Sequence, residues 1–170
     1  DRTRDLNGAH VEFCSGISNP IGIKVGPTTK HNDLVKVINR INPNNEEGKI
    51  VLIVRMGAGN IEKLYPPIIR AIKKNKLKVV WSCDPMHANT EKAKSGYKTR
   101  IFKNILSEVK SFFKVHNSED TYAGGIHLEM TGQNVTECMG GMQKISDKDL
   151  SSRYHTPVSY THLTLPTTTI

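Results

Sequence analysis

Short runs of apolar, often β-branched residues alternate with segments of helical periodicity, and this alternation constrains the fold more than any other feature of the chain. Runs bounded by glycine, proline and polar residues are typical of short buried strands. Such strands, separated by segments long enough for a helix, predict a parallel sheet with crossover connections. The expected strands are residues 20–27, 50–54, 77–81 and 124–129.

Helical patterns lie between these expected strands. Residues 98–116 carry apolar side chains at helical spacing. A proline pair suits the first turn of a helix at residues 66–75, and residues 33–41 form another segment with one apolar face. Residues 3–15 are a weaker candidate because Gly8 interrupts them. The fold class is therefore α/β, and either a doubly wound sheet or a piece of a (β/α)8 barrel fits the pattern.

Composition narrows the class of protein. The chain has 170 residues, fewer than the roughly 250 of a complete (β/α)8 barrel. No window approaches the roughly 20 apolar residues of a membrane span, so we expect no membrane partner. The net charge of +8 comes from scattered lysines, which favour a solvated surface over a nucleic-acid site. The 3 cysteines form no C-x-x-C pair, which favours a reducing compartment.

Polar side chains stand at the carboxyl ends of the expected strands, where parallel β/α folds collect their functional groups. Lys24 and Arg55 suit a phosphate or carboxylate, and Arg55 can bind it in a bidentate manner. Asp84 and His87 follow the third strand, and Glu129 ends the fourth. A histidine and a carboxylate suit Zn, Mn, Fe or Co, although two ligands are fewer than a complete site requires. Any single polar residue at a strand end is ordinary.

Several neighbours of these residues have plainer interpretations. His127 would share a strand face with Glu129, where a structural role and metal ligation are both open. Cys83 is interpreted as a buried structural thiol and Trp81 as a core residue. Residues 57–59 resemble part of a dinucleotide-binding loop but lack its third glycine and acidic partner.

Two long motifs, DPMHANT at residues 84–90 and GGIHLEMTGQNVTEC at residues 124–138, resemble a known family. They are similar to the signatures of class II (plant and microbial type) 3-deoxy-D-arabino-heptulosonate-7-phosphate (DAHP) synthase. Shorter matches are DRTR at residues 1–4, GIKVGP at residues 22–27 and RMG at residues 55–57. The resemblance extends from the first residue to about residue 156.

The resemblance implies an incomplete (β/α)8 TIM barrel, with residues 1–156 forming about four of the eight β/α units, from its second half. It implies a transferase that condenses phosphoenolpyruvate with erythrose 4-phosphate to DAHP and phosphate. This reaction opens the shikimate pathway to chorismate and the aromatic amino acids. It also implies a divalent metal, Mn²⁺ or Co²⁺, and a homo-oligomer when the protein is full length. The expected compartment is the plastid in a plant or alga and the cytoplasm otherwise.

The resemblance also assigns roles to individual residues. His87 and Glu129 match metal ligands at the catalytic centre. Asp1 stands where the family more usually has Glu, although its backbone can still serve. Four residues match positions that hold phosphoenolpyruvate, namely Asp1, Arg2, Lys24 and Arg55.

The end of the chain departs from the family pattern. The family's metal-binding Cys and a further substrate Arg lie upstream of this sequence, and Ser159 stands about where the last ligand, an Asp, is expected. Residues 157–170 lack charged side chains and resemble translated sequencing-adapter readthrough, so we expect a non-native or disordered tail. An alternative function is therefore a truncated, inactive fragment or a phosphate-binding pseudo-enzyme. Half a barrel with open sheet edges is expected to fold poorly alone.

Overall fold

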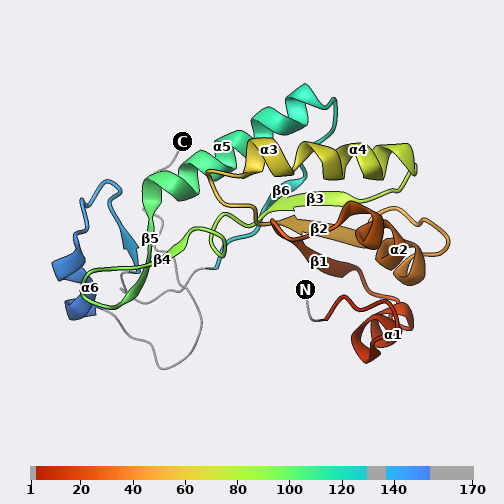
Figure 1. Cartoon of the computed structure of the whole chain (residues 1–170), viewed down its shortest axis with the longest axis horizontal. Coiled ribbons are helices and arrows are strands. Elements are labelled where there is room, and N and C mark those ends of the chain that lie inside the picture. The colour runs from red at the N-terminus through yellow and green to blue at the C-terminus, as the bar shows by residue number, and fades with distance from the viewer. Residues whose placement is uncertain (1–2, 130–136, 154–170) are drawn as a thin grey trace.

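The computed structural model describes residues 3–129 and 137–153 of the chain. Figure 1 shows a sheet flanked by helices, together with a smaller group of strands at one end of the molecule. In chain order the elements are α1 (Ala9–Ser15), β1 (Ile21–Val25), α2 (His31–Ile41), β2 (Ile50–Val54), α3 (Ile61–Leu64), α4 (Pro66–Lys74), β3 (Val80–Cys83), β4 (Thr90–Lys92), β5 (Lys98–Ile101), α5 (Phe102–Ser118), β6 (Gly125–Ile126), β7 (Cys138–Met139) and α6 (Asp147–Arg153).

The main sheet has four parallel strands in the order β1-β2-β3-β6, which confirms the predicted α/β class with a parallel sheet. The register places Leu52 of β2 beside Ile23 of β1 and Trp81 of β3. The order of the strands across this sheet is also their order along the chain, although β4 and β5 of the second sheet come between β3 and β6. The described sheet therefore contains no reversal of strand order, which a doubly wound sheet has at its switch point.

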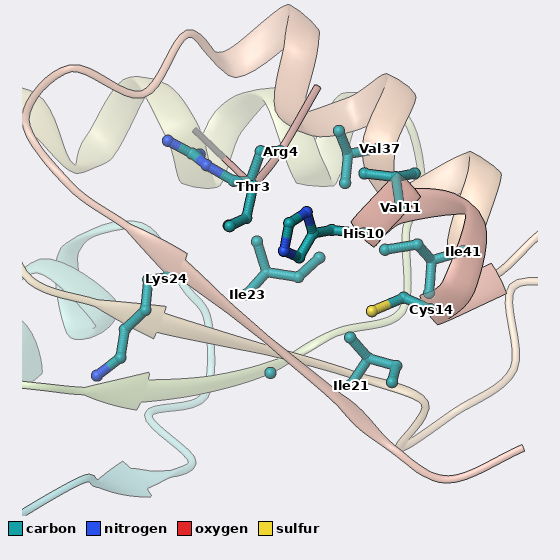
Figure 2. A pocket seen from close by; sticks show the side chains of 11 residues that line it. Thr3, Arg4, His10, Val11, Cys14, Ile21, Ile23, Lys24, Val37 and Ile41 are labelled. Carbon is teal, nitrogen blue, oxygen red and sulfur yellow. The ribbon is translucent and has the colours of Figure 1, made fainter. Parts of the chain in front are cut away.

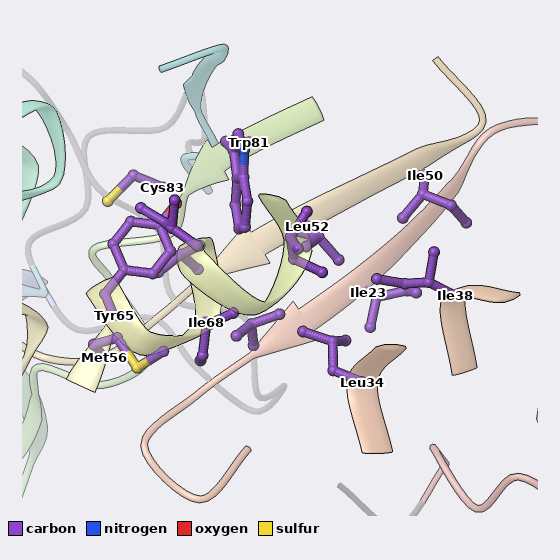
Figure 3. Close-up of a cluster of buried hydrophobic side chains, with 14 of the residues drawn as sticks. Ile23, Leu34, Ile38, Ile50, Leu52, Met56, Tyr65, Ile68, Trp81 and Cys83 are labelled. Atoms are coloured by element: carbon purple, nitrogen blue, oxygen red, sulfur yellow. The ribbon is translucent and has the colours of Figure 1, made fainter. Parts of the chain in front are cut away.

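One face of the main sheet is covered by helices because alternate strand residues are apolar and buried. In β2, Ile50, Leu52 and Val54 are fully buried, whereas Val51 and Ile53 between them are partly exposed. The buried strand residues pack with side chains from α2, α4 and α5 in a single cluster. Figure 3 shows members of this cluster from the strands, α2 and α4. Its members include Ile23, Val25, Leu52, Val54, Trp81 and Cys83 from strands, and Leu34, Ile38, Ile68, Ile69, Ile72, Phe112 and Val115 from helices.

The opposite face of the main sheet has a different character. Lys24, Ile53 and Ser82 lie side by side in the register of three neighbouring strands, and all three are partly exposed. The strand backbone directs these side chains away from the helix-covered core. Charged groups can therefore be presented on this face without disturbing the core.

The second sheet, β4-β5-β7, corrects one helix prediction. The helix expected at residues 98–116 begins only at Phe102, because Lys98–Ile101 pairs antiparallel with β4 and parallel with β7. Thr99 donates a hydrogen bond from Oγ1 to the carbonyl of Glu137 at 2.6 Å. Buried strand pairing therefore overrides the helical periodicity in this segment.

Other boundaries differ by a few residues. The strand expected at 77–81 is observed at Val80–Cys83, because Lys76 adopts a positive φ of 53° and the Leu77 N–H bonds the carbonyl of Ile72 where α4 ends. The weak helix at 3–15 is shortened to α1, which begins after Gly8. The strand expected at 124–129 is reduced to β6.

None of the helices in the described part of the chain is long and apolar enough to cross a membrane. The predicted tail at residues 157–170 lies outside the described residues.

Candidate metal and phosphate site

The carboxyl edge of the main sheet brings together side chains from the ends of two strands. Lys24 is in β1, Asp84 directly follows β3, and His87 lies three residues further on. The Nζ of Lys24 forms an ion pair with Oδ2 of Asp84, whose side chain is 0% exposed. The sequence places Lys24 and Asp84 60 residues apart, and the parallel register brings them into contact. The structure thus places the carboxyl ends of β1 and β3 close enough for their polar side chains to interact.

Asp84 fixes the turn that carries His87. Its Oδ1 accepts hydrogen bonds from the backbone N–H groups of Met86 and His87 at 3.0 and 3.3 Å, a local arrangement that aspartate favours in turns. Burial alone raises the pKa of Asp84, but hydrogen bonds from His87 and Lys24 and the charge of Lys24 outweigh it and hold the pKa well below its ordinary value. Asp84 is therefore a buried carboxylate that is ionised and well partnered.

The imidazole of His87 is oriented from one side by Asp84. Its Nδ1 lies 2.7 Å from Oδ2 of Asp84, and because that carboxylate can only accept, Nδ1 carries the proton. In the neutral ring, Nε2 then presents a lone pair to Oε1 of Glu129 at 3.3 Å. Two electron-rich atoms that face each other in this way need a proton or a cation between them.

These two atoms fit the donor set of a metal site. Two donors that each lie about 2.1 Å from one ion at a roughly tetrahedral angle are about 3.4 Å apart, close to the separation of His87 and Glu129. A histidine that binds a metal through one ring nitrogen usually donates a hydrogen bond from the other nitrogen to a carboxylate. Asp84 is in position to accept this bond from His87. Within residues 3–129 and 137–150, no group of three His, Cys, Asp or Glu side chains converges in this way.

Cys83 does not join this pair. Its side chain is fully buried in the core under the helices, and burial raises the pKa of its thiol far above the ordinary value. A protonated thiol is a poor metal ligand because the thiolate is the ligating form. The interpretation of Cys83 as a structural thiol is confirmed, and so is that of Trp81 as a core residue.

A second group of cations lies beside the loop that follows β1. The guanidinium of Arg55 passes over Gly26, where a Cβ would lie 3.6 Å from its Cζ. Arg4 donates from Nη1 to Oγ1 of Thr29 at 3.1 Å. Burial and the nearby charge of Arg55 together lower the pKa of Arg4. Two guanidinium groups that repel each other favour the binding of an anion.

Arg4 was not among the residues predicted to bind substrate, although its motif, DRTR, was recognised. The prediction instead named Asp1 and Arg2, which lie outside the described residues. The signal for Arg4 is its place two residues after Arg2, in the same short motif.

A buried carboxylate, Glu108, was also missed. It lies on the buried face of α5 between Ile105 and Phe112 and accepts hydrogen bonds from the N–H groups of Met56 and Gly57. An acidic residue in the middle of an apolar helical stripe is the sequence signal that marks it, since an unpartnered charge is costly there.

A cavity of about 250 Å³ lies beside β1 and is separate from the His87–Glu129 pair (Figure 2). Figure 2 shows that Lys24 extends away from His10 and Cys14, which belong to α1. Most of the lining is apolar, including Val11 and Ile41. The lining also includes the charged side chains of Arg4 and Lys24.

Comparison with known proteins agrees with these motifs. Residues 1–159 match the model of the class-II DAHP synthetase family. The phospho-2-dehydro-3-deoxyheptonate aldolase of Mycolicibacterium smegmatis is 52% identical over 156 residues, which cover 92% of this chain and 34% of that protein. The protein of the same name from Neurospora crassa is 47% identical over 156 residues, which cover 91% of this chain and 32% of that protein.

The chain thus spans about a third of the length of the curated relatives it matches. The family match covers nearly all of the sequence, including every motif that the strand ends present. The chain belongs to the class-II DAHP synthetase family.

Proposed function

We propose that this chain is part of a 3-deoxy-7-phosphoheptulonate synthase, a transferase that joins phosphoenolpyruvate, erythrose 4-phosphate and water to give DAHP and phosphate. The observation that carries the proposal is the alignment of Lys24, Asp84, His87 and Glu129 at the carboxyl edge of the sheet. Family membership and the names of both relatives support the same activity. The reaction would open aromatic amino acid biosynthesis.

The two cationic groups suit the anionic substrates. Arg55 can hold a phosphate or carboxylate in a bidentate manner, and Lys24 offers a point charge within reach of the same face of the sheet. The ion pair with Asp84 fixes the ammonium of Lys24 in place before substrate binds, which reduces the cost of ordering it. We assign phosphoenolpyruvate to Lys24 and Arg55, together with Asp1 and Arg2 of the same motif as Arg4.

His87 and Glu129 would hold the divalent metal, for which Mn²⁺ and Co²⁺ are the leading candidates. When bound, such an ion supplies Lewis-acid polarisation of the aldehyde of erythrose 4-phosphate. The contribution of the chain itself is to orient the ring, with the Nδ1 proton directed at Asp84 and Nε2 aimed at Glu129, which Asp84 achieves from the other side of the ring. The new bond would form between C3 of phosphoenolpyruvate and the aldehyde carbon.

The sheet suits a sector of a (β/α)8 barrel. The strands follow one another in chain order, the helices cover one face, and the polar residues lie on the other face and at the carboxyl edge, as in a barrel. In the part of the chain that the structure describes, β1 is an edge strand with an apolar cavity beside it, and a preceding barrel strand would run there. We assign residues 1–156 to the barrel and propose that residues 157–170 are not native to it.

A phosphate-release assay tests this proposal. In a full-length synthase that carries this chain (below, the full-length enzyme), phosphate release should require both substrates and a divalent metal. Replacement of Arg55 by Ala should raise the KM for phosphoenolpyruvate, whereas replacement of the exposed Lys36 by Ala should not. Full-length protein that binds phosphoenolpyruvate without releasing phosphate would instead support the pseudo-enzyme alternative. The 170-residue chain assayed beside it should be inactive.

A further inference from the structure

The side chain of Glu108 is an unexpected group in the interior of the molecule. It is 0% exposed and lies on the buried face of α5, between Ile105 and Phe112. A carboxylate in such surroundings is costly unless hydrogen bonds compensate for the lost water. An apolar residue would satisfy the packing of the helix, so the hydrogen bonds of Glu108 indicate why an acid is present.

Both oxygens of Glu108 bind the loops that follow strands β2 and β3. Oε1 accepts hydrogen bonds from the backbone N–H groups of Met56 and Gly57, at 2.7 and 2.8 Å. Oε2 accepts from Nδ2 of Asn89 at 2.6 Å. The carboxylate therefore contacts the backbone of one loop and a side chain of the other.

Asn89 completes the connection between the two loops. Its Nδ2 also donates to the carbonyl of Pro85 at 2.8 Å, and its Oδ1 accepts from the N–H of Ala58 at 3.0 Å. Gly57 adopts a φ of 84°, and a Cβ there would lie 3.1 Å from the carbonyl oxygen of Ala88. The two loops are thus bridged by hydrogen bonds and packed backbone against backbone.

The bridged loops carry the two halves of the proposed site. Arg55 immediately precedes Met56, and His87 lies between Pro85 and Asn89. We propose that Glu108 is a positioning residue that fixes the substrate-binding loop of Arg55 relative to the metal-binding loop of His87. This inference rests on the proposed function, because it assigns one substrate anion and the metal to these two loops.

Glu108→Gln in the full-length enzyme tests the proposal. The substitution keeps the size and one oxygen, but turns its amide nitrogen toward Nδ2 of Asn89, so two donors face each other. We expect kcat/KM to fall by at least about 10-fold, and the KM for phosphoenolpyruvate and the Kd for Mn²⁺ both to rise. Hydrogen exchange at the amides of Met56, Gly57 and Ala58 should accelerate, while amides of β2 keep their protection.

Glu62→Gln is the matched control. Glu62 also joins two elements, since it binds Ser111 and Lys114 of α5 from α3, but it is exposed and contacts neither loop. This variant should match the wild-type enzyme in kinetics and in Mn²⁺ binding. A folded Glu108→Gln enzyme with wild-type KM, kcat and Kd would overturn the positioning role.

Two further variants keep the test decisive. If Glu108→Gln fails to fold, Asn89→Ala provides the test. It removes the bridge between the loops but leaves the hydrogen bonds of Glu108 to Met56 and Gly57. It should change kcat/KM, the KM for phosphoenolpyruvate and the Kd for Mn²⁺ in the same directions, by smaller factors. The double variant Glu108→Gln/Asn89→Asp restores a donor opposite an acceptor between these two side chains but loses the donor to the Pro85 carbonyl, so it should restore the protection of the Met56 and Gly57 amides more than kcat/KM. A wild-type full-length enzyme without synthase activity would refute the proposed function. An active wild-type enzyme whose Glu108→Gln variant has normal kinetics would refute only this inference.

Discussion

The two faces of the main sheet use alternate residues of the same strands for different purposes. On the helix-covered face, Leu52, Val54 and Cys83 are fully buried and form the core. On the other face, Lys24 reaches the carboxyl edge and forms an ion pair with Asp84. Neighbouring residues of one strand therefore serve stability and chemistry separately. Substitutions on the two faces should have effects that can be told apart.

Two residues depart from this separation of buried apolar and charged side chains, and both contact the loops at the carboxyl edge. Asp84 and Glu108 are carboxylates with fully buried side chains, and each accepts several hydrogen bonds. Such groups hold a unique arrangement when fully satisfied, and they are costly when one partner is lost. The boundary between the faces is therefore where stability and function are expected to be coupled.

The largest expected effect is on the helix-covered face. Leu52→Ala in the full-length enzyme should reduce the local unfolding free energy of the sheet by about 3–5 kcal/mol, because it leaves a cavity at the centre of the core. Native-state hydrogen exchange of the β2 amides measures this change. The folded protein should keep its KM for phosphoenolpyruvate. A large rise in KM without loss of amide protection would contradict the separation of the two faces.

A fall in pH should destabilise the core on the helix-covered face through protonation of His116. Tyr65 and Thr121 hold its ring nitrogens at 2.7 Å each, and burial lowers its pKa to about 4. An unfolded histidine has a pKa of about 6.5, so protonation favours unfolding. The stabilisation is complete above about pH 6.5 and falls by about 2–3 kcal/mol as the pH drops to about 4.

Urea unfolding of the full-length enzyme across this pH range provides the measurement for His116. His116→Phe should flatten the curve between about pH 4 and pH 6.5, because the group that binds the proton on unfolding is gone. His10→Gln, at an exposed position, should leave the curve unchanged. Equal slopes for the wild-type enzyme and His116→Phe would show that another group controls acid sensitivity.

On the functional face, Asp84→Asn should lower the Mn²⁺ affinity of the full-length enzyme by about 10–100-fold, equivalent to about 1.4–2.7 kcal/mol. The substitution keeps the shape but removes the negative charge beside Lys24 and the acceptor that orients His87. Calorimetric titration with Mn²⁺ measures the effect. The exposed Asp33→Asn provides the control, and equal affinities for the two variants would exclude an orienting role for Asp84.

The smallest expected effect lies where the two faces meet. Gly57→Ala should cost about 1–2 kcal/mol, since an alanine is strained at a φ of 84° and would press on the carbonyl of Ala88. Gly59→Ala, with open space around its Cβ, should cost far less. Hydrogen exchange of the loop amides compares the two. A cost for Gly59→Ala as large as that for Gly57→Ala would mean that the close approach of the loops is unimportant.

The sequence predicted the sheet well because its strands bury one face. The run at residues 50–54 reads directly as β2, and the helix of residues 66–75 matches α4. The β4-β5-β7 sheet was missed, since its strands are short and one of them precedes a helix without a break. Pairing of β5 with β7, far along the chain, is a tertiary effect that local periodicity does not contain.

The residues of the proposed site were singled out in part for a similar reason. Strand ends and motifs mark Lys24, His87 and Glu129 in the sequence, and the structure brings Lys24 to Asp84 and His87 to Glu129. Arg4 and Glu108 were missed because their roles come from contacts with loops distant in the sequence. The prediction for Asp1 and Arg2 concerns residues outside those described.

Titration of the full-length enzyme with Mn²⁺, followed by electron paramagnetic resonance, tests most directly whether the Asp84–His87–Glu129 group forms part of a metal site. The wild-type enzyme should bind Mn²⁺ tightly. His87→Ala and Glu129→Gln should each weaken binding by at least about 100-fold and abolish phosphate release, whereas His10→Ala should do neither. Wild-type Mn²⁺ affinity together with normal phosphate release in His87→Ala would contradict the account.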